Sequence, residues 1–158
     1  MPISQFPFGS ATSLVQALRQ RKVSSLDLLN AYLTRIDKHN LAINAIVVQD
    51  RRAARAQARK ADEEAARGEW RGPLHGLPMT VKEAFDLKGH PTTIGYPSMT
   101  NNVAATDALA VQRLKAAGAI VFGKSNVPLN NGDFQTYNAL YGTTCNPWDI
   151  TRGAGGSS

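Results

Sequence analysis

The sequence predicts an α/β fold in which helices flank a mixed sheet. Three observations support this class: helical spacing of leucines near the N-terminus, an alternating run that ends at Lys82, and the uninterrupted apolar run from Ala119 to Phe122. An uninterrupted apolar run of this kind is typical of a strand that is buried on both faces. Strands and helices that follow one another along a chain favour a layered α/β architecture.

The N-terminal part of the chain is expected to be mainly helical. Residues 12–20 and 24–39 place their leucines at helical spacing, so each segment predicts an amphipathic helix. Residues 44–49 form a short run rich in β-branched side chains and are expected to be a strand. Residues 50–67 are expected to form a further helix that ends at Gly68, where a glycine commonly follows a helix.

Length and composition describe one soluble domain. The chain has 158 residues, of which 42% are hydrophobic and 19% charged, and no apolar run is long enough to cross a membrane. The N-terminus lacks the basic region and apolar core of a signal peptide. Cys145 is the only cysteine, which excludes an internal disulfide and favours a reducing compartment. We therefore expect a cytoplasmic protein without a membrane partner.

The net charge of +6 raises the question of nucleic-acid binding. Much of the excess lies in the third predicted helix, where Arg51, Arg55 and Arg59 recur at every fourth position and share one face. Acidic residues follow directly, and no aromatic residues alternate with the arginines to stack on bases. A solvent-exposed helix face is the simpler interpretation, and no nucleic-acid partner is expected.

Lys82 is the first candidate for chemistry. Residues 77–82 alternate apolar side chains with others, and the apolar pair Ala84-Phe85 follows shortly after the lysine. A lysine in such a place must reach water, find a carboxylate or lose its proton, and reaching water is the ordinary outcome. However, the glycine-rich residues 153–158 include two adjacent serines, and a lysine beside a serine can activate a hydroxyl without histidine.

Four segments resemble motifs of the amidase signature family, in the same order and spacing. The segment G-P-L-H-G-L-P-M-T-V-K-E is similar to the lysine motif of that family, and the final G-G-S-S is similar to the first half of its G-G-S-S-G-G motif. Between them lie A-A-G-A-I-V-F-G-K-S-N-V-P and Y-G-T-T-C-N-P-W-D, which also resemble the family. The resemblance extends over nearly the whole chain.

The resemblance implies an amidase, which hydrolyses the C–N bond of a small carboxamide substrate without a cofactor or metal. Residues 1–158 would form the N-terminal part of a single amidase domain, and the sheet would be incomplete in this chain. Residues 1–68 would be its helical start. Residues 69–158 would supply the lysine strand, the buried strand and the glycine- and serine-rich loops of the site.

The resemblance also implies roles for four residues. Lys82 would be the catalytic lysine, and Ser157 would be a serine in a cis peptide that relays protons between the nucleophile and the lysine. Asn131 and Gly132 fall in the substrate-facing loop and are candidate binding residues. The nucleophile and oxyanion hole belong to a later motif of the family. We therefore expect this chain alone to be inactive, with a buried strand that lacks a neighbour.

Two positions depart from the family pattern. Ala154 stands where the family usually has a proline before the paired glycines. Residues 129–131, Leu-Asn-Asn, stand where members that act in tRNA-dependent amidation usually carry an acidic residue. The second departure favours a general carboxamide hydrolase over a component of a tRNA-dependent amidotransferase.

Residues 118–125 match the pattern of a P-loop, G-x-x-x-x-G-K-[ST]. A P-loop requires a phosphate-binding loop between the two glycines and a helix after the final residue. Here the intervening residues are the predicted buried strand, and Pro128 follows too soon for a helix to begin. The alternative function, a noncatalytic nucleotide-binding module, depends on this match alone. Lys124 is better interpreted as a residue that borders the site.

Overall fold

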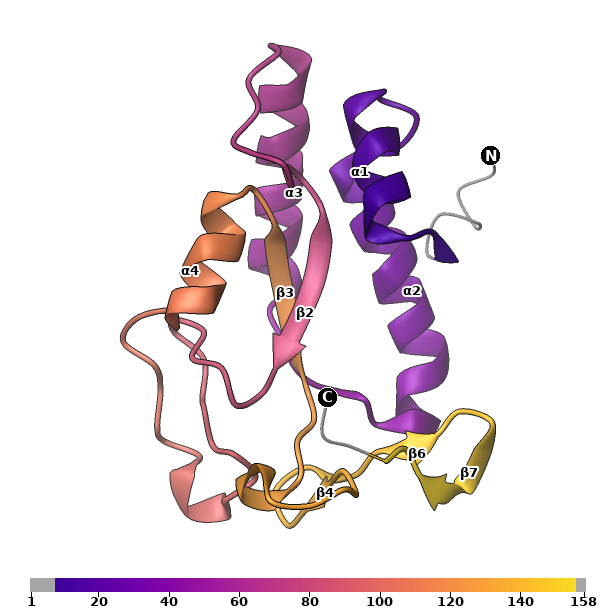
Figure 1. Ribbon diagram of the computed structural model, residues 1–158, viewed down its shortest axis with the longest axis vertical. Helices are drawn as coiled ribbons and strands as arrows, with labels where there is room; N and C mark the ends of the chain where they lie inside the picture. The colour runs from indigo at the N-terminus through magenta and orange to yellow at the C-terminus, as the bar shows by residue number, and fades with distance from the viewer. Residues whose placement is uncertain (1–7, 156–158) are drawn as a thin grey trace. The chain divides into compact units, whose positions relative to one another are not determined.

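The computed structural model describes residues 8–155 (Figure 1). The chain divides into two compact units. The helical unit comprises the residues up to Ile36 together with Asp50–Met79 and Gln112–Phe122, and the loop unit comprises Asp37–Gln49, Thr80–Val111 and the residues from Gly123 on.

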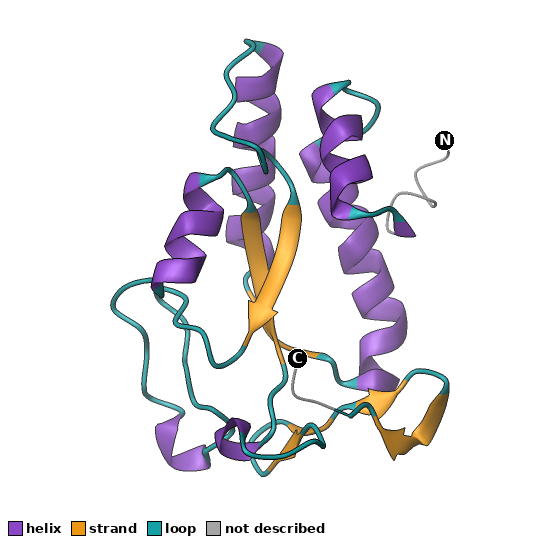
Figure 2. Ribbon diagram, in the orientation of Figure 1, coloured by secondary structure: helices purple, strands orange, loops and turns teal. Residues whose placement is uncertain are grey.

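Helices account for most of the regular structure (Figure 2). The α-helices are α1 (Ala11–Arg19), α2 (Ser25–Ile43), α3 (Arg51–Ala66) and α4 (Leu109–Ala116), and the 3-10 helices are η2 (Pro97–Met99) and η3 (Leu129–Asn131). The main strands are β1 (Ile46–Gln49), β2 (Pro78–Lys82) and β3 (Ile120–Ser125). The short strands are β4 (Tyr137–Asn138), β5 (Gly142–Thr143), β6 (Cys145–Asn146) and β7 (Asp149–Gly153).

The main sheet has the strand order β1-β3-β2. Strand β1 is antiparallel to β3, with Val48 opposite Lys124. Strand β2 runs parallel to β3. The backbone N–H of Ile120 donates to the carbonyl of Leu77 at one end, and the backbone N–H of Glu83 donates to the carbonyl of Ser125 at the other. The predicted α/β class with a mixed sheet is therefore confirmed. The expectation that the buried strand lacks a neighbour is wrong, since β3 is the central strand.

The predicted helices and the first strand are confirmed with small shifts of their ends. The helix expected at 24–39 continues to Ile43. The first strand begins two residues later than expected, because Asn44 has a positive φ of 55° and ends the preceding segment. The side-chain oxygen of Asn40 accepts hydrogen bonds from the backbone N–H groups of Ala45 and Ile46, which stabilises this change of direction.

The core of the helical unit joins α2, α3 and β3. Its fully buried side chains on α3 are all alanines, and they pack with leucines of α2 and with Ile120 and Phe122 of β3. Small methyl side chains allow a helix to approach its neighbours closely. Asp62 on α3 also accepts hydrogen bonds from the N–H groups of Ser25 and Leu26, at 2.6 and 3.1 Å, and so completes the N-terminus of α2.

The arginines of α3 lie away from these buried alanines. Arg59 is exposed, and Arg55 is half-buried with its Nε donating to the side-chain oxygen of Asn30 at 3.0 Å.

Among residues 8–155, no helix combines the length and apolar character that a membrane crossing would need.

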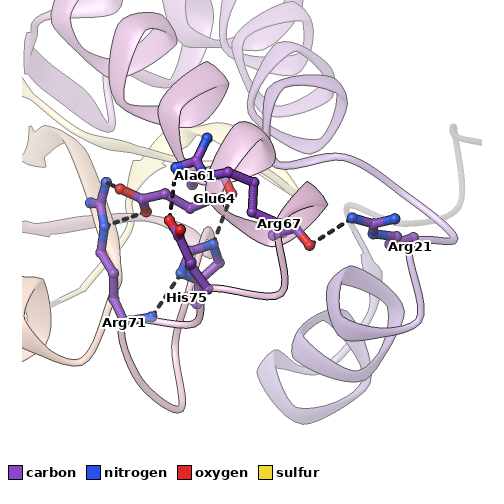
Figure 3. Close-up of polar contacts among 8 residues, drawn as sticks. Arg21, Ala61, Glu64, Arg67, Arg71 and His75 are labelled. Carbon is purple, nitrogen blue, oxygen red and sulfur yellow. Dashed lines mark hydrogen bonds and ion pairs between the residues drawn. The ribbon is translucent and has the colours of Figure 1, made fainter.

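His75 fixes the turn that leads into β2 (Figure 3). The Nδ1 atom accepts a hydrogen bond from the backbone N–H of Arg71 at 3.1 Å, so Nε2 carries the proton and donates to the carbonyl of Ala61 at 2.8 Å. The His75 ring is buried, and it packs edge to face with the ring of Trp70, with the ring centroids 5.0 Å apart. The Arg71 guanidinium also pairs with the carboxylate of Glu64 at 2.6 Å. Both ring nitrogens are used structurally.

Candidate active site

Lys82 is the last residue of β2 and lies where the chain leaves the sheet. The N–H of Glu83 still pairs with the carbonyl of Ser125 at 2.9 Å, and the carbonyl of Lys82 accepts a turn hydrogen bond from Phe85 at 3.0 Å. Lys82 is half-buried, as are the other residues of β2 after Pro78. The alternation of buried and exposed residues expected from the sequence is therefore absent from β2. Hydrogen bonds nevertheless hold both the carbonyl and the N–H of the peptide that follows Lys82.

Glu83, which the sequence did not single out, is completely buried. Its Oε1 atom accepts hydrogen bonds from the backbone N–H and the hydroxyl of Thr93, at 2.7 and 2.9 Å, and from the hydroxyl of Tyr141 at 3.3 Å. Its Oε2 atom accepts from the N–H of Ile94 at 3.0 Å. Each of these four groups donates to the carboxylate, which satisfies its buried oxygens.

Lys124 is the lysine that the fold removes from water. The residue is completely buried, and Nζ donates to the carbonyl of Pro91 at 2.6 Å and to the hydroxyl oxygen of Thr92 at 3.1 Å. Burial lowers the pKa of Lys124, and the nearby charges of Glu83 and Asp86 act in the opposite direction. The expected strand lysine at 82 is thus the more accessible of the two.

The turn at residues 92–95 connects this buried layer to the loops of the site. Ile94 has a positive φ of 45°, a conformation that a β-branched residue rarely adopts. The hydroxyl oxygen of Thr93 accepts a hydrogen bond from the N–H of Gly95 at 3.1 Å, and the carbonyl of Ile94 accepts one from the N–H of Asn130 at 2.8 Å. The turn therefore contacts the segment that contains the predicted binding residues.

Three buried polar side chains organise the loops after β3. Asn138 donates to the side-chain oxygen of Asn126 at 2.9 Å. Asn126 donates to the hydroxyl oxygen of Thr144 at 3.1 Å, and the hydroxyl of Thr144 donates to the carbonyl of Asn44 at 2.7 Å. Asn138 also accepts hydrogen bonds from the backbone of the turn that follows it. These bonds give a well-defined path to a segment with little regular structure.

The two predicted binding residues lie at η3. Asn131 ends this 3-10 turn, Gly132 follows it, and both are exposed. Asn130 and Asn131 both have positive φ, 55° and 54°. Their roles in binding stay predictions.

The predicted proton-relay residue Ser157 lies outside the described residues. The chain that leads toward it is held by two hydrogen bonds: Thr136 donates its hydroxyl to the carbonyl of Gly155 at 2.8 Å, and Ala154 donates its N–H to the carbonyl of Thr144 at 3.0 Å. The structure thus brings Glu83, the 92–95 turn and η3 together, while the partnership of Lys82 with Ser157 stays a prediction.

The P-loop match at residues 118–125 is occupied by strand. Ile120–Ser125 forms β3, and Gly123 lies so close to β1 that a Cβ there would come within 2.6 Å of the Val48 carbonyl oxygen. A phosphate-binding loop needs accessible backbone N–H groups between its glycines. The prediction that this match is a buried strand is confirmed, and the nucleotide-binding alternative loses its support.

Comparison with known proteins gives consistent matches over almost the whole chain. The sequence matches the protein family described as Amidase over residues 27–158. It is 39% identical to an acylamidase of Rhodococcus erythropolis over 149 residues, which cover 94% of this chain and 31% of that protein. It is 42% identical to a glutamyl-tRNA(Gln) amidotransferase subunit of Azoarcus sp. over 150 residues, which cover 95% of this chain and 31% of that protein.

The solved structures agree with the sequence matches. The fold is similar to that of the native peptide amidase from Stenotrophomonas maltophilia, with a TM-score of 0.85 and 30% sequence identity. The similarity covers 96% of this chain and 33% of the peptide amidase. The chain spans less than a third of the length of the two curated relatives described above.

Proposed function

This chain belongs to the amidase family, and we propose that it forms the N-terminal part of a single domain that hydrolyses the C–N bond of a small carboxamide. The observation that carries the proposal is the position of Lys82 at the end of β2, where hydrogen bonds fix both the carbonyl and the N–H of the peptide that follows the lysine. Relatives named acylamidase and peptide amidase support the same reaction class.

In the proposed reaction, Lys82 and Ser157 move protons and do not bond to the substrate. A serine nucleophile from a later motif attacks the carbonyl carbon, while its proton passes through the Ser157 hydroxyl to the amine of Lys82. The same proton returns along this path to the leaving amine, so the C–N bond breaks without a free amide anion. Water then cleaves the ester by the same relay and regenerates the serine.

We propose that Asn131 and Gly132 contact the amide substrate. Their exposed position on a turn that the 92–95 segment holds supports this role, because binding residues commonly lie on loops placed by a rigid scaffold. We also propose that the enzyme acts in the cytoplasm without a nucleic-acid partner. The free, half-buried Cys145 is compatible with a reducing compartment.

A second candidate is a component of a tRNA-dependent amidotransferase. The 42% identity to the Azoarcus protein favours it, whereas Leu-Asn-Asn at residues 129–131 favours a free-standing hydrolase. Ammonia release from simple amides, in the absence of any tRNA or partner protein, distinguishes the two. A hydrolase turns over such amides by itself, and strict dependence on a charged tRNA would support the amidotransferase.

The proposed roles are tested in the complete enzyme, meaning this chain continued through the rest of the amidase domain. Lys82→Met and Ser157→Ala should each lower kcat by about 10³-fold or more, with the fold intact by circular dichroism. The double variant should lose little more than the worse single variant, because the two residues act as one relay. Lys88→Met, at an exposed lysine on the following loop, is the matched control. Near-normal turnover by Lys82→Met would exclude the relay.

A further inference from the structure

We propose that Glu83 is a positioning residue for the amide hydrolysis inferred above, and that it acts by holding the 92–95 turn, which in turn holds the loop of Asn131. This inference rests on the proposed function, because it concerns the placement of the proposed binding residues. Glu83 lies directly after Lys82, and its carboxylate accepts hydrogen bonds from Thr93, Ile94 and Tyr141.

The Glu83 carboxylate contacts two consecutive backbone N–H groups. Thr93 and Ile94 donate to its two oxygens at 2.7 and 3.0 Å, and the Thr93 hydroxyl adds a third bond at 2.9 Å. Successive N–H groups that converge on one anion form a strong and directional binding arrangement. A glutamine side chain of the same size could not accept all of these bonds, because its NH₂ group would face a donor.

These hydrogen bonds hold Ile94 in an unusual backbone conformation. Ile94 has a φ of 45°, which is unfavourable for any residue with a branched Cβ. Such a conformation persists only where surrounding contacts enforce it. The Ile94 N–H bond to Glu83 is one such contact, so loss of the carboxylate should let the turn relax toward an ordinary negative φ.

The 92–95 turn in turn holds the loop that contains the predicted binding residues. The carbonyl of Ile94 accepts a hydrogen bond from the N–H of Asn130 at 2.8 Å, and Asn130 and Asn131 both have positive φ. The next residue in the turn, Gly95, packs so tightly on Asn138 that a Cβ there would lie 2.7 Å from the Asn138 Cβ. A change in φ at Ile94 would therefore move the anchor of the Asn130-Asn131 segment.

A purely structural explanation is that Glu83 only balances the charge of buried Lys124. Lys124 contacts Pro91 and Thr92, the residues just before the Glu83-bound pair, so the two charges share one buried layer. Under this explanation, loss of Glu83 lowers stability throughout the layer without a specific effect at Asn130. The two explanations differ in where the structure loosens and in which kinetic constant changes.

The test compares Glu83→Gln, Glu83→Asp and the control Glu63→Gln, an exposed glutamate on α3, in the complete enzyme. Hydrogen exchange by mass spectrometry follows the peptide of residues 128–133, with the peptide of residues 118–123, which includes the first four residues of β3, as internal reference. We expect Glu83→Gln to speed exchange at 128–133 about tenfold or more and to leave the reference unchanged. We expect KM to rise about tenfold with a smaller change in kcat, and Glu83→Asp to recover part of both effects.

Equal loss of protection in both peptides, or unchanged exchange at residues 128–133, would overturn the positioning role. If Glu83→Gln does not fold, Thr93→Val and Thr93→Ser provide a second comparison: Val removes the hydroxyl that donates to the carboxylate and accepts from the N–H of Gly95, whereas Ser keeps both bonds. Hydrogen exchange needs no catalysis, so an enzyme that hydrolyses no amide would refute the proposed function without deciding this inference. Normal amide hydrolysis with unaltered KM and exchange in Glu83→Gln would refute the inference alone.

Discussion

The Nζ atom of Lys124 donates a hydrogen bond of 2.6 Å to the carbonyl oxygen of Pro91. A second donor hydrogen of the same amine meets the hydroxyl oxygen of Thr92 at 3.1 Å. These two acceptors satisfy two of the N–H groups of the buried amine. Burial lowers the pKa of Lys124 below its ordinary value.

Lys124 is expected to make the free energy of unfolding rise with pH in the alkaline range. Its folded-state pKa is lower than the ordinary value of 10.5, so between the two values the unfolded chain binds more protons than the folded chain. The free energy of unfolding must therefore increase as the pH rises from the folded-state pKa to the unfolded-state pKa. Below the folded-state pKa both states bind the proton, so Lys124 causes no such increase there. Urea unfolding of the wild type and of Lys124→Met at a series of pH values gives the free energy of unfolding of each protein. The difference between the two free energies is then compared across the pH series.

The wild type should gain stability relative to Lys124→Met as the pH approaches 10.5. Lys88→Met, at an exposed lysine, should follow the wild-type pH dependence and serves as the control. Parallel curves for the wild type and Lys124→Met, or a relative loss of stability by the wild type, would contradict the prediction.

Asn138→Ala is expected to lower the free energy of unfolding by about 2–4 kcal/mol. The side chain is buried and bonds to Asn126 and to the carbonyl of Val127, at 2.9 and 2.8 Å, so its loss leaves buried polar groups unpaired. Chemical unfolding of the 158-residue chain gives the difference. Asn101→Ala, at an exposed asparagine in the same unit, should change stability by less than about 0.5 kcal/mol. A similar small effect at both positions would show that the buried amides do not organise the loops.

Gly118→Ala and Gly68→Ala separate steric exclusion from backbone strain. Both glycines have positive φ, 97° and 77°, but a Cβ at Gly118 would lie 2.6 Å from the Cα of His75, whereas a Cβ at Gly68 would meet nothing within 4 Å. We expect Gly68→Ala to cost about 1–2 kcal/mol from backbone strain alone, and Gly118→Ala to cost at least about 3 kcal/mol. Thermal unfolding of both variants provides the measurement, and equal costs would exclude the steric term.

The sequence predicted the elements better than it predicted the buried charges. Apolar periodicity located the helices and β3, because burying a helix face or a central strand requires that pattern. Glu83 and Lys124 are completely buried, yet in sequence they look like ordinary surface residues. The burial of Glu83 depends on donors 10 and 58 positions away, at Thr93 and Tyr141, and no local pattern records such pairings.

The sequence also predicted the candidate site only where a local pattern marks a residue. Lys82 could be found because a strand end and a family-like motif coincide at one residue. Lys82 is half-buried, whereas the burial of Lys124 depends on contacts with Pro91 and Thr92, which lie 33 and 32 positions away in the sequence, and such contacts are a tertiary property. The positive φ angles at Ile94 and Asn131 were also invisible, since neither residue type requires them.

The 158-residue chain by itself is expected to release no ammonia from aliphatic or aromatic amides. The resemblance to the amidase signature family assigns the nucleophile and the oxyanion hole to a later motif, and the chain spans 31% of the acylamidase it matches. Loss of one oxyanion-hole donor typically costs about 10²–10³ in kcat, and loss of the nucleophile costs more. A coupled ammonia assay, with the complete enzyme as the positive control, measures the difference.

The structure adds a reason to expect a folded but inactive chain. Strand β3 has a neighbour on each side, and the polar network of Asn126, Asn138 and Thr144 is internally paired, so inactivity should not come from unfolding. A cooperative thermal transition together with no ammonia release is the expected result. Measurable turnover that survives repurification would contradict the prediction, and it would move the nucleophile onto Ser158 or another serine of this chain.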